Sequence, residues 1–134
     1  MATVLIVEDN PANMTLAVFL LQSVGHTVLS ATNAEAGLTL AHDEQPNLIL
    51  MDIQLPGMDG LEAAALLKGA EATRAIPVIA LTALAMKGDE ERIRAAGCDG
   101  YIAKPMHYRE FLETVAVHLA GASPEAQSAA GNQR

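Results

Sequence analysis

Short apolar runs alternate with longer amphipathic segments along most of the chain. Each run is bounded by turn-forming or polar residues, which is typical of strands buried in a parallel sheet. We expect five such strands, at residues 3–7, 27–31, 48–51, 77–81 and 100–103. The third, with the sequence LILM, is the most apolar. It is therefore the best candidate for a central strand.

The segments between these runs have helical periodicity and recognisable ends. Asn10 is a typical N-cap, Pro11 suits the first helical position, and Gly25 suits a left-handed C-cap. We expect helices at residues 11–24, from an N-cap at Asn33 to near Pro46, and at residues 60–67, 87–96 and 108–119. The last has one apolar stripe, formed by Tyr108, Phe111, Leu112, Val115 and Leu119.

Strands that alternate with helices predict an α/β fold, in which helices cover both faces of a parallel sheet. The 134 residues suffice for one domain with a hydrophobic core, and no repeat suggests a second. We expect residues 1–121 to form this domain. Residues 122–134 are small and polar, so we expect a disordered C-terminal tail.

The composition argues against nucleic acid as a partner and against a location in or across a membrane. Eight basic and 16 acidic residues give a net charge of −8, which argues against nucleic acid as a partner. No apolar run approaches the roughly 18 residues of a membrane span. The N-terminus lacks the basic start of a signal peptide, and the single cysteine, Cys98, excludes an internal disulfide. We therefore expect a cytoplasmic protein without membrane insertion, with Cys98 as a small packed residue.

Chemically reactive side chains stand where four of the expected strands end. They are Glu8 and Asp9, Asp52, Thr82, and Lys104. Open α/β sheets bind ligands in the crevice at this edge, so we expect these groups to lie close together. Three carboxylates repel one another unless a cation joins them, and Mg²⁺ favours such oxygen ligands. Asp52 could then act as a nucleophile toward a phosphoryl group, with Lys104 and Thr82 positioning its oxygens.

At these positions the sequence resembles the receiver domain of two-component response regulators. The matching motifs are Glu8-Asp9, Asp52 within LILMDIQLPGMDG, Thr82-Ala83 within PVIALTA, Tyr101, and Lys104-Pro105. The resemblance covers about residues 2–120, and the single-domain regulators of bacterial cell polarity and cell division look most similar, through ALTALAMKGDEERIRAAGCDGYIAKP. It implies a flavodoxin-like, doubly wound sheet of five parallel strands in the order 2-1-3-4-5, with five helices.

The resemblance also implies roles for individual residues. Asp52 would accept the phosphoryl group, and Mg²⁺ would be bound by Asp9, by Asp52 and by the backbone carbonyl of Gln54. Glu8, where many receivers have aspartate, would bind the ion through water.

Lys104 would contact the phosphoryl group, and its bond to Pro105 would be cis. Thr82 and Tyr101 would form a switch pair that changes the surface made by the fourth helix, the fifth strand and the fifth helix.

The function implied is that of a stand-alone response regulator, which receives phosphate from a histidine kinase or histidine phosphotransfer protein and contacts a downstream protein. It would be a monomer or weak dimer that catalyses only its own phosphorylation and dephosphorylation. The candidate docking residues for the donor are Pro11, Met14, Pro105 and Met106, with Ala12 and Ala17 allowing a donor helix to approach closely.

Three alternatives remain. The chain could be the receiver module of a hybrid kinase, or an interaction module that is never phosphorylated, although the latter would predict a damaged acid pocket. It could also be a Mg²⁺-dependent phosphatase with an aspartyl nucleophile. Such enzymes need a second acid two residues after the nucleophile, where this chain has Gln54.

Overall fold

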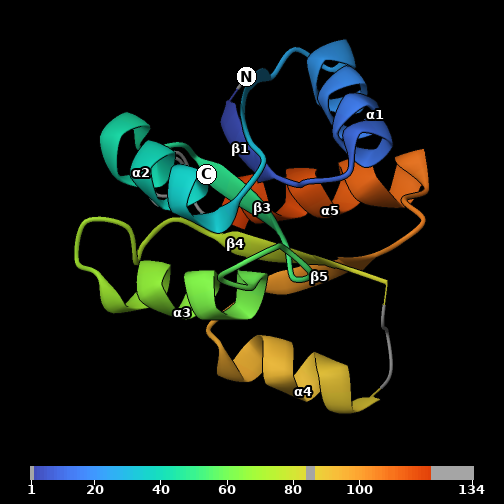
Figure 1. Ribbon diagram of the computed structural model, residues 1–134. Coiled ribbons are helices and arrows are strands. Elements are labelled where there is room, and N and C mark those ends of the chain that lie inside the picture. Colours follow the sequence, from blue (N-terminus) through green and yellow to red (C-terminus); the bar gives the residue numbers. More distant parts are fainter. Residues whose placement is uncertain (1, 84–86, 122–134) are drawn as a thin grey trace.

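The structure, a computed structural model, describes residues 2–83 and 87–121, in which five strands alternate with five helices (Figure 1). The strands are β1 (Thr3–Val7), β2 (Thr27–Ala31), β3 (Leu48–Asp52), β4 (Val78–Thr82) and β5 (Gly100–Ala103). The helices are α1 (Pro11–Ser23), α2 (Ala34–Glu44), α3 (Gly60–Gly69), α4 (Lys87–Ala95) and α5 (Tyr108–Gly121). The disordered tail predicted at residues 122–134 lies outside the described residues.

All five strands are parallel, in the order β2-β1-β3-β4-β5, which confirms the predicted doubly wound sheet. Helices α1 and α5 lie on one face of the sheet, and α2, α3 and α4 lie on the other (Figure 1). Because side chains alternate along a strand, Leu48 and Leu50 of β3 pack toward the first face, whereas Ile49 and Met51 pack toward the second.

The predicted helix caps are confirmed. The side-chain oxygen of Asn10 accepts the Asn13 N–H at 2.9 Å, and that of Asn33 accepts the Ala36 N–H at 2.8 Å. These bonds satisfy backbone donors that a helix start otherwise leaves unpaired. After α1, Gly25 has a φ of 93°, the left-handed conformation that only glycine adopts at little cost.

Several element boundaries differ from the prediction by one or two residues: the ends of α1, α3, α4 and α5, the end of β3 and both ends of β4. Helix α3 continues to Gly69 instead of ending at Leu67, and the Thr73 hydroxyl donates to the Leu67 carbonyl at 2.7 Å near its end. Strand β4 begins after Pro77, which has no N–H for the ladder, and it includes Thr82.

The apolar stripe of α5 was predicted one residue too long. Phe111 and Val115 are buried, but Tyr108 is 59% exposed. Helical side chains lean toward the N-terminus of their helix. The side chain of Tyr108, the first residue of α5, therefore extends past the helix start and away from the core. The buried residue at this end is instead Met106, which precedes the helix.

Within residues 2–83 and 87–121, no helix has both the length and the apolar character needed to cross a membrane.

The two phenylalanines of the chain provide a matched test of this core. Phe111 has no exposed surface, whereas Phe19 on α1 is 65% exposed. We expect Phe111→Ala to lower the free energy of unfolding by about 3–5 kcal/mol, because it leaves a cavity. Phe19→Ala should change it by less than about 1 kcal/mol. Urea denaturation of both variants measures the difference, and equal losses would contradict the packing described here.

Candidate functional site

An ion-paired cluster stands at the carboxyl edge of the sheet. Glu8 follows β1, Asp52 ends β3, and Lys104 follows β5. The Lys104 ammonium lies 2.9 Å from Glu8 Oε1 and 3.0 Å from Asp52 Oδ2. The carboxylate side chains are 1% and 4% exposed, and that of Lys104 is 15% exposed. The three groups that the sequence placed in one crevice are therefore in direct contact.

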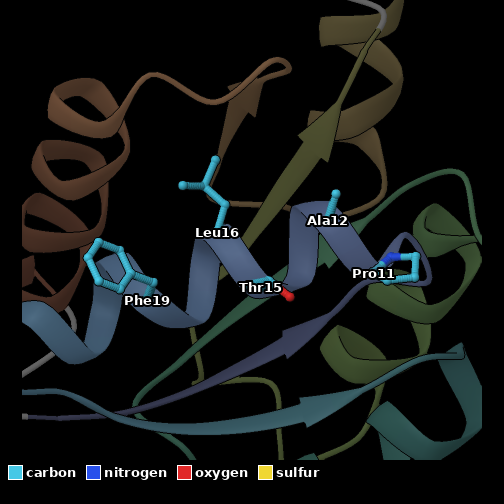
Figure 2. Close-up of a pocket in the computed structure, with 5 residues that line it drawn as sticks. All are labelled: Pro11, Ala12, Thr15, Leu16 and Phe19. Atoms are coloured by element: carbon cyan, nitrogen blue, oxygen red, sulfur yellow. The ribbon is translucent and has the colours of Figure 1, made fainter.

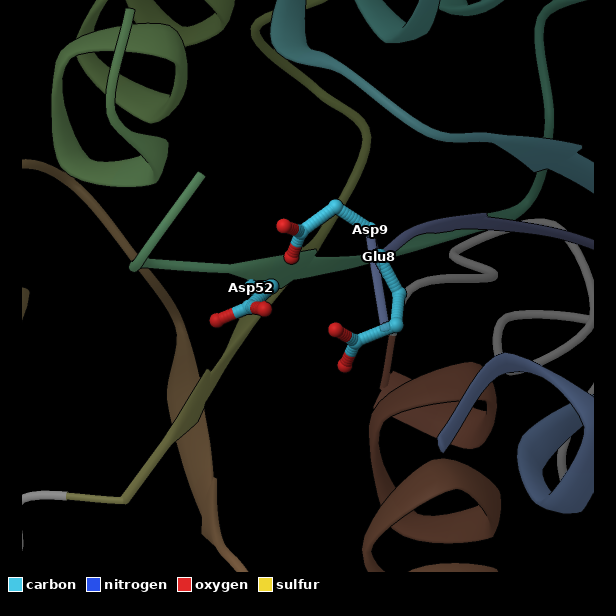
Figure 3. Close-up of side chains that lie close together, drawn as sticks. All are labelled: Glu8, Asp9 and Asp52. Carbon is cyan, nitrogen blue, oxygen red and sulfur yellow. The ribbon is translucent and has the colours of Figure 1, made fainter. Parts of the chain in front are cut away.

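A third carboxylate completes the cluster. Asp9 is exposed, and one oxygen each from Glu8, Asp9 and Asp52 lies within 4.8 Å of the other two. Figure 3 shows the three side chains converging from the ends of β1 and β3. The predicted grouping of acids at this edge is therefore present in the structure.

Backbone groups orient two of these acids. The Gln54 N–H donates to Asp52 Oδ1 at 3.0 Å, and the Asn10 N–H donates to Glu8 Oε2 at 3.1 Å. Glu8 Oε1 differs, because it is buried and its contact with Lys104 lacks the geometry of a directed hydrogen bond. One buried carboxylate oxygen thus faces the cluster without a well-placed donor.

The burial of these charges has electrostatic consequences. Burial raises the pKa of Glu8 above its ordinary value, and the neighbouring Asp52 carboxyl raises it further, against smaller opposing effects of Lys104 and the Asn10 N–H. For Lys104, burial alone would lower the pKa, but the Glu8 and Asp52 carboxylates outweigh it and raise the pKa. The ammonium therefore stays charged, yet it does not offset the whole cost of ionising Glu8.

These observations fit a divalent cation. Carboxylate oxygens from three residues converge, one of them lacks a directed donor, and burial penalises the ionised form of Glu8. Mg²⁺ prefers oxygen ligands of this kind and needs only one or two carboxylates from a protein. The donor set of the cluster is thus suitable for Mg²⁺.

Thr82 and Tyr101 lie on the opposite side of the sheet from Lys104. Thr82 is buried at the end of β4, one residue beyond Leu81, the register partner of Asp52. Tyr101 is half-buried and packs against the core on the face that carries α2, α3 and α4. In the ladder Thr82 pairs with Ala103, so Tyr101 is two residues further from the edge.

The predicted docking residues are divided between surface and core. Pro11 and Pro105 are exposed, and Met14 is partly buried against the core. Met106 and Ala17 are 8% and 1% exposed, so the core rather than a partner takes up these side chains. The docking prediction rested on apolar and small residues near Asp52, and the sequence alone does not show which of them the sheet covers.

Only part of an apolar patch on α1 was predicted from the sequence, since Pro11 and Ala12 were included but neither Leu16 nor Phe19. Its residues line an open surface pocket along the outer face of the helix: Pro11, Ala12, Thr15, Leu16 and Phe19 (Figure 2). We call these five residues the α1 patch. The available signal was the sequence PANMTLAVFLLQS, which contains no charged residue in 13 positions. A helix with so little polar surface is normally buried over most of its circumference, yet Phe19 and Leu16 are exposed.

Two smaller expectations are confirmed. The peptide bond between Lys104 and Pro105 is cis. Cys98 is buried, and burial raises the pKa of its thiol to about 11, helped by Asp99. The thiol is therefore protonated at neutral pH and serves packing, not nucleophilic chemistry.

Known proteins with this sequence pattern and fold are numerous. The model of the response regulator receiver domain family matches residues 4–116. The polar-differentiation response regulator DivK of Brucella anthropi is 49% identical over 120 residues, covering 90% of this chain and 98% of DivK. DivK of Brucella ovis has the same identity and coverage.

Solved structures agree. A CheY-like receiver domain protein from Methanospirillum hungatei superposes with a TM-score of 0.85 at 30% identity, covering 93% of this chain and 98% of its own. The receiver domain of the sensor histidine kinase PA1611 from Pseudomonas aeruginosa has a TM-score of 0.83 at 34% identity, with 89% and 98% covered, and holds a magnesium ion in its active-site cleft. Sequence, fold and acidic cluster agree, and the chain belongs to the response regulator receiver domain family.

Proposed function

We propose that Asp52 accepts a phosphoryl group from a phosphohistidine and that the chain then signals by protein–protein contact. Response regulator receivers interact with histidine kinases and with downstream targets. The observation that carries this proposal is the position of the Asp52 carboxylate. Its Oδ2 lies 3.0 Å from the Lys104 ammonium, and its Oδ1 is held by the Gln54 N–H. A carboxylate oriented in this way beside a fixed positive charge suits attack on phosphorus.

In this transfer an Asp52 carboxylate oxygen forms a bond to phosphorus while the bond between phosphorus and the histidine nitrogen breaks. The histidine leaves with that electron pair. Lys104, which the Glu8 and Asp52 carboxylates keep charged despite its burial, would contact the phosphoryl oxygens. The Thr82 hydroxyl, at the end of the neighbouring strand, would contact them from the other side.

We further propose a Mg²⁺ site in the same crevice. Asp9, Asp52 and the backbone carbonyl of Gln54 would bind the ion directly, and Glu8 would bind it through water. When bound, the ion would neutralise charge on the transferring oxygens. The converging carboxylates and the buried Glu8 Oε1 support this site, as does the magnesium ion in the similar PA1611 receiver.

Thr82 and Tyr101 would transmit the signal. On phosphorylation the Thr82 hydroxyl would move toward the phosphoryl group, and the Tyr101 ring would turn inward behind it. Their location supports this role, because both lie on the α4 side of the sheet and Tyr101 borders a surface pocket between β5 and α5. The responding surface would comprise α4, β5 and α5.

The α1 patch, with Met14 and Pro105, would dock the phosphoryl donor. Pro11 begins α1 directly after the acid cluster, so a donor seated on the patch would reach Asp52. Because the α1 patch is apolar and uncharged, it suits the apolar face of a donor helix.

We propose a stand-alone regulator that is cytoplasmic and monomeric or weakly dimeric. The similarity to DivK, which is matched over 98% of its length, supports the stand-alone form over a module of a hybrid kinase.

The acceptor is tested by incubating the protein with acetyl phosphate and Mg²⁺. We expect intact mass to rise by about 80 Da in the wild type and to stay constant in Asp52→Asn. Asp43→Asn, which changes an exposed acid on α2, should behave like the wild type. Labelling of Asp52→Asn at the wild-type rate would assign the phosphoryl group to another residue.

The metal site is tested by thermal unfolding at two pH values. The raised pKa of Glu8 means that its protonated form stabilises the fold below the ordinary value of 4.5, a contribution lost as pH rises through the folded value. Mg²⁺ needs ionised ligands, so it should raise the Tm more at pH 7.5 than at pH 5. At roughly a hundredfold excess over Kd, the rise at pH 7.5 should be about 5–10 °C.

Asp9→Asn removes an exposed carboxylate from the proposed Mg²⁺ ligands and should abolish most of this rise, whereas Asp43→Asn should preserve it. An undiminished Mg²⁺ effect in Asp9→Asn would place the ion elsewhere.

The docking surface is tested with a histidine phosphotransfer protein that phosphorylates the wild type. Leu16→Glu puts a charge into the α1 patch and should slow transfer from this protein roughly tenfold or more, while the rate with acetyl phosphate stays unchanged. Leu66→Glu, at an exposed leucine of α3 on the other face of the sheet, should leave both rates unchanged. Equal effects of the two variants would remove the α1 patch as the docking site.

A further inference from the structure

The first residue of α3, Gly60, lies against the main chain of the residue that carries the chemistry. A Cβ atom added at Gly60 would lie 2.1 Å from the Asp52 carbonyl oxygen and 2.6 Å from the Ile53 Cα. Both distances are far below van der Waals contact. The obstacles are backbone atoms at the end of a central strand, which cannot move aside like a flexible side chain. Only glycine fits here without displacing the helix or the strand.

Two hydrogen bonds hold the start of α3 in this place. The Gly60 N–H donates to the Ile53 carbonyl at 3.2 Å, so the loop that leaves β3 closes back onto the strand end. The Asp59 side chain caps the helix by accepting the Glu62 N–H at 2.8 Å. The helix start is therefore fixed both to itself and to β3.

The peptide between Asp52 and Ile53, which Gly60 contacts on one side, is also held on its other side. The Ile53 N–H donates to the Leu81 carbonyl of β4 at 3.1 Å. The peptide between Asp52 and Ile53 thus lies between β4 and the start of α3. One residue further, the Gln54 N–H orients Asp52 Oδ1, so a displacement of this segment changes the orientation of the carboxylate.

We propose that Gly60 is a positioning residue for phosphoryl transfer. Its missing side chain lets α3 press against the Asp52–Ile53 peptide, which keeps the carboxylate between the Lys104 ammonium and the Gln54 N–H. The inference rests on the proposed role of Asp52 as acceptor. It adds that the packing of α3 sets the rate at which Asp52 reacts.

The test compares alanine substitutions at three glycines. Gly60→Ala introduces the backbone conflict. Gly69→Ala changes the other end of the same helix, where no atom lies within 4 Å of the added Cβ. Gly37→Ala, on α2, also introduces a steric conflict, at 2.6 Å, but with the branched side chain of Val7 and not with the Asp52 segment. It therefore controls for lost stability.

Phosphorylation by acetyl phosphate is measured at saturating donor and Mg²⁺, at a temperature where circular dichroism shows every variant folded. We expect Gly60→Ala to react roughly tenfold to a hundredfold more slowly than the wild type. Gly69→Ala and Gly37→Ala should stay within about twofold. In NMR spectra the Gln54 amide resonance should shift in Gly60→Ala and not in the two controls, and the rate should fall further in Gly60→Ala than in Gly37→Ala at equal loss of stability, which a purely structural role of Gly60 would not produce.

A wild-type rate in folded Gly60→Ala would overturn the proposal, as would a loss of rate in Gly60→Ala and Gly37→Ala that simply follows their loss of stability. If the wild type and Gly69→Ala also take up no phosphate, the acceptor role itself fails. If Gly60→Ala does not fold, Asp59→Ala replaces it, because it loosens the helix start without a steric conflict. Asp59→Ala should then react severalfold more slowly, and an unchanged rate would contradict the proposal.

Discussion

The interaction on which the site depends is the contact of one lysine with two buried carboxylates. Lys104 lies within 3.0 Å of both Glu8 and Asp52, and Asp9 adds a third acid at the rim. In the described part of the chain this cluster combines three negative groups with one ammonium, and burial raises the pKa of Glu8 accordingly. Three carboxylates and one ammonium leave an excess of negative charge when all are ionised, which a bound cation or protonation of Glu8 would reduce.

The parallel sheet places the site residues next to both helical layers. Strands β1, β3 and β5 deliver the ion-paired groups toward the face covered by α1 and α5, beside the exposed α1 patch. Strand β4 and Tyr101 lead toward the face covered by α2, α3 and α4. Asp52 ends a central strand, β3, between these two layers. The residues just before it in the strand, Met51 and Leu50, pack on opposite faces of the sheet.

Much of this arrangement follows from local sequence. Apolar runs, asparagine caps and acids at strand ends predict the fold and the crevice, because each depends on neighbouring residues in the chain. The features that the sequence did not predict depend on tertiary contacts. Whether Met106 and Ala17 face a partner or the core depends on where the sheet lies, and the overhang of Tyr108 depends on where α5 starts. The closeness of Gly60 to the Asp52 carbonyl has no local signature either, because it arises when α3 folds back onto β3.

The central claim is that Asp52 accepts a phosphoryl group in a crevice that needs a divalent cation. Beryllofluoride, a phosphoryl mimic that does not turn over, tests it directly by ¹⁹F NMR, independently of any donor protein or of hydrolysis. We predict protein-bound fluoride resonances only when Mg²⁺ is present, and none in Asp52→Asn. Bound resonances that persist without Mg²⁺, or in Asp52→Asn, would contradict the account.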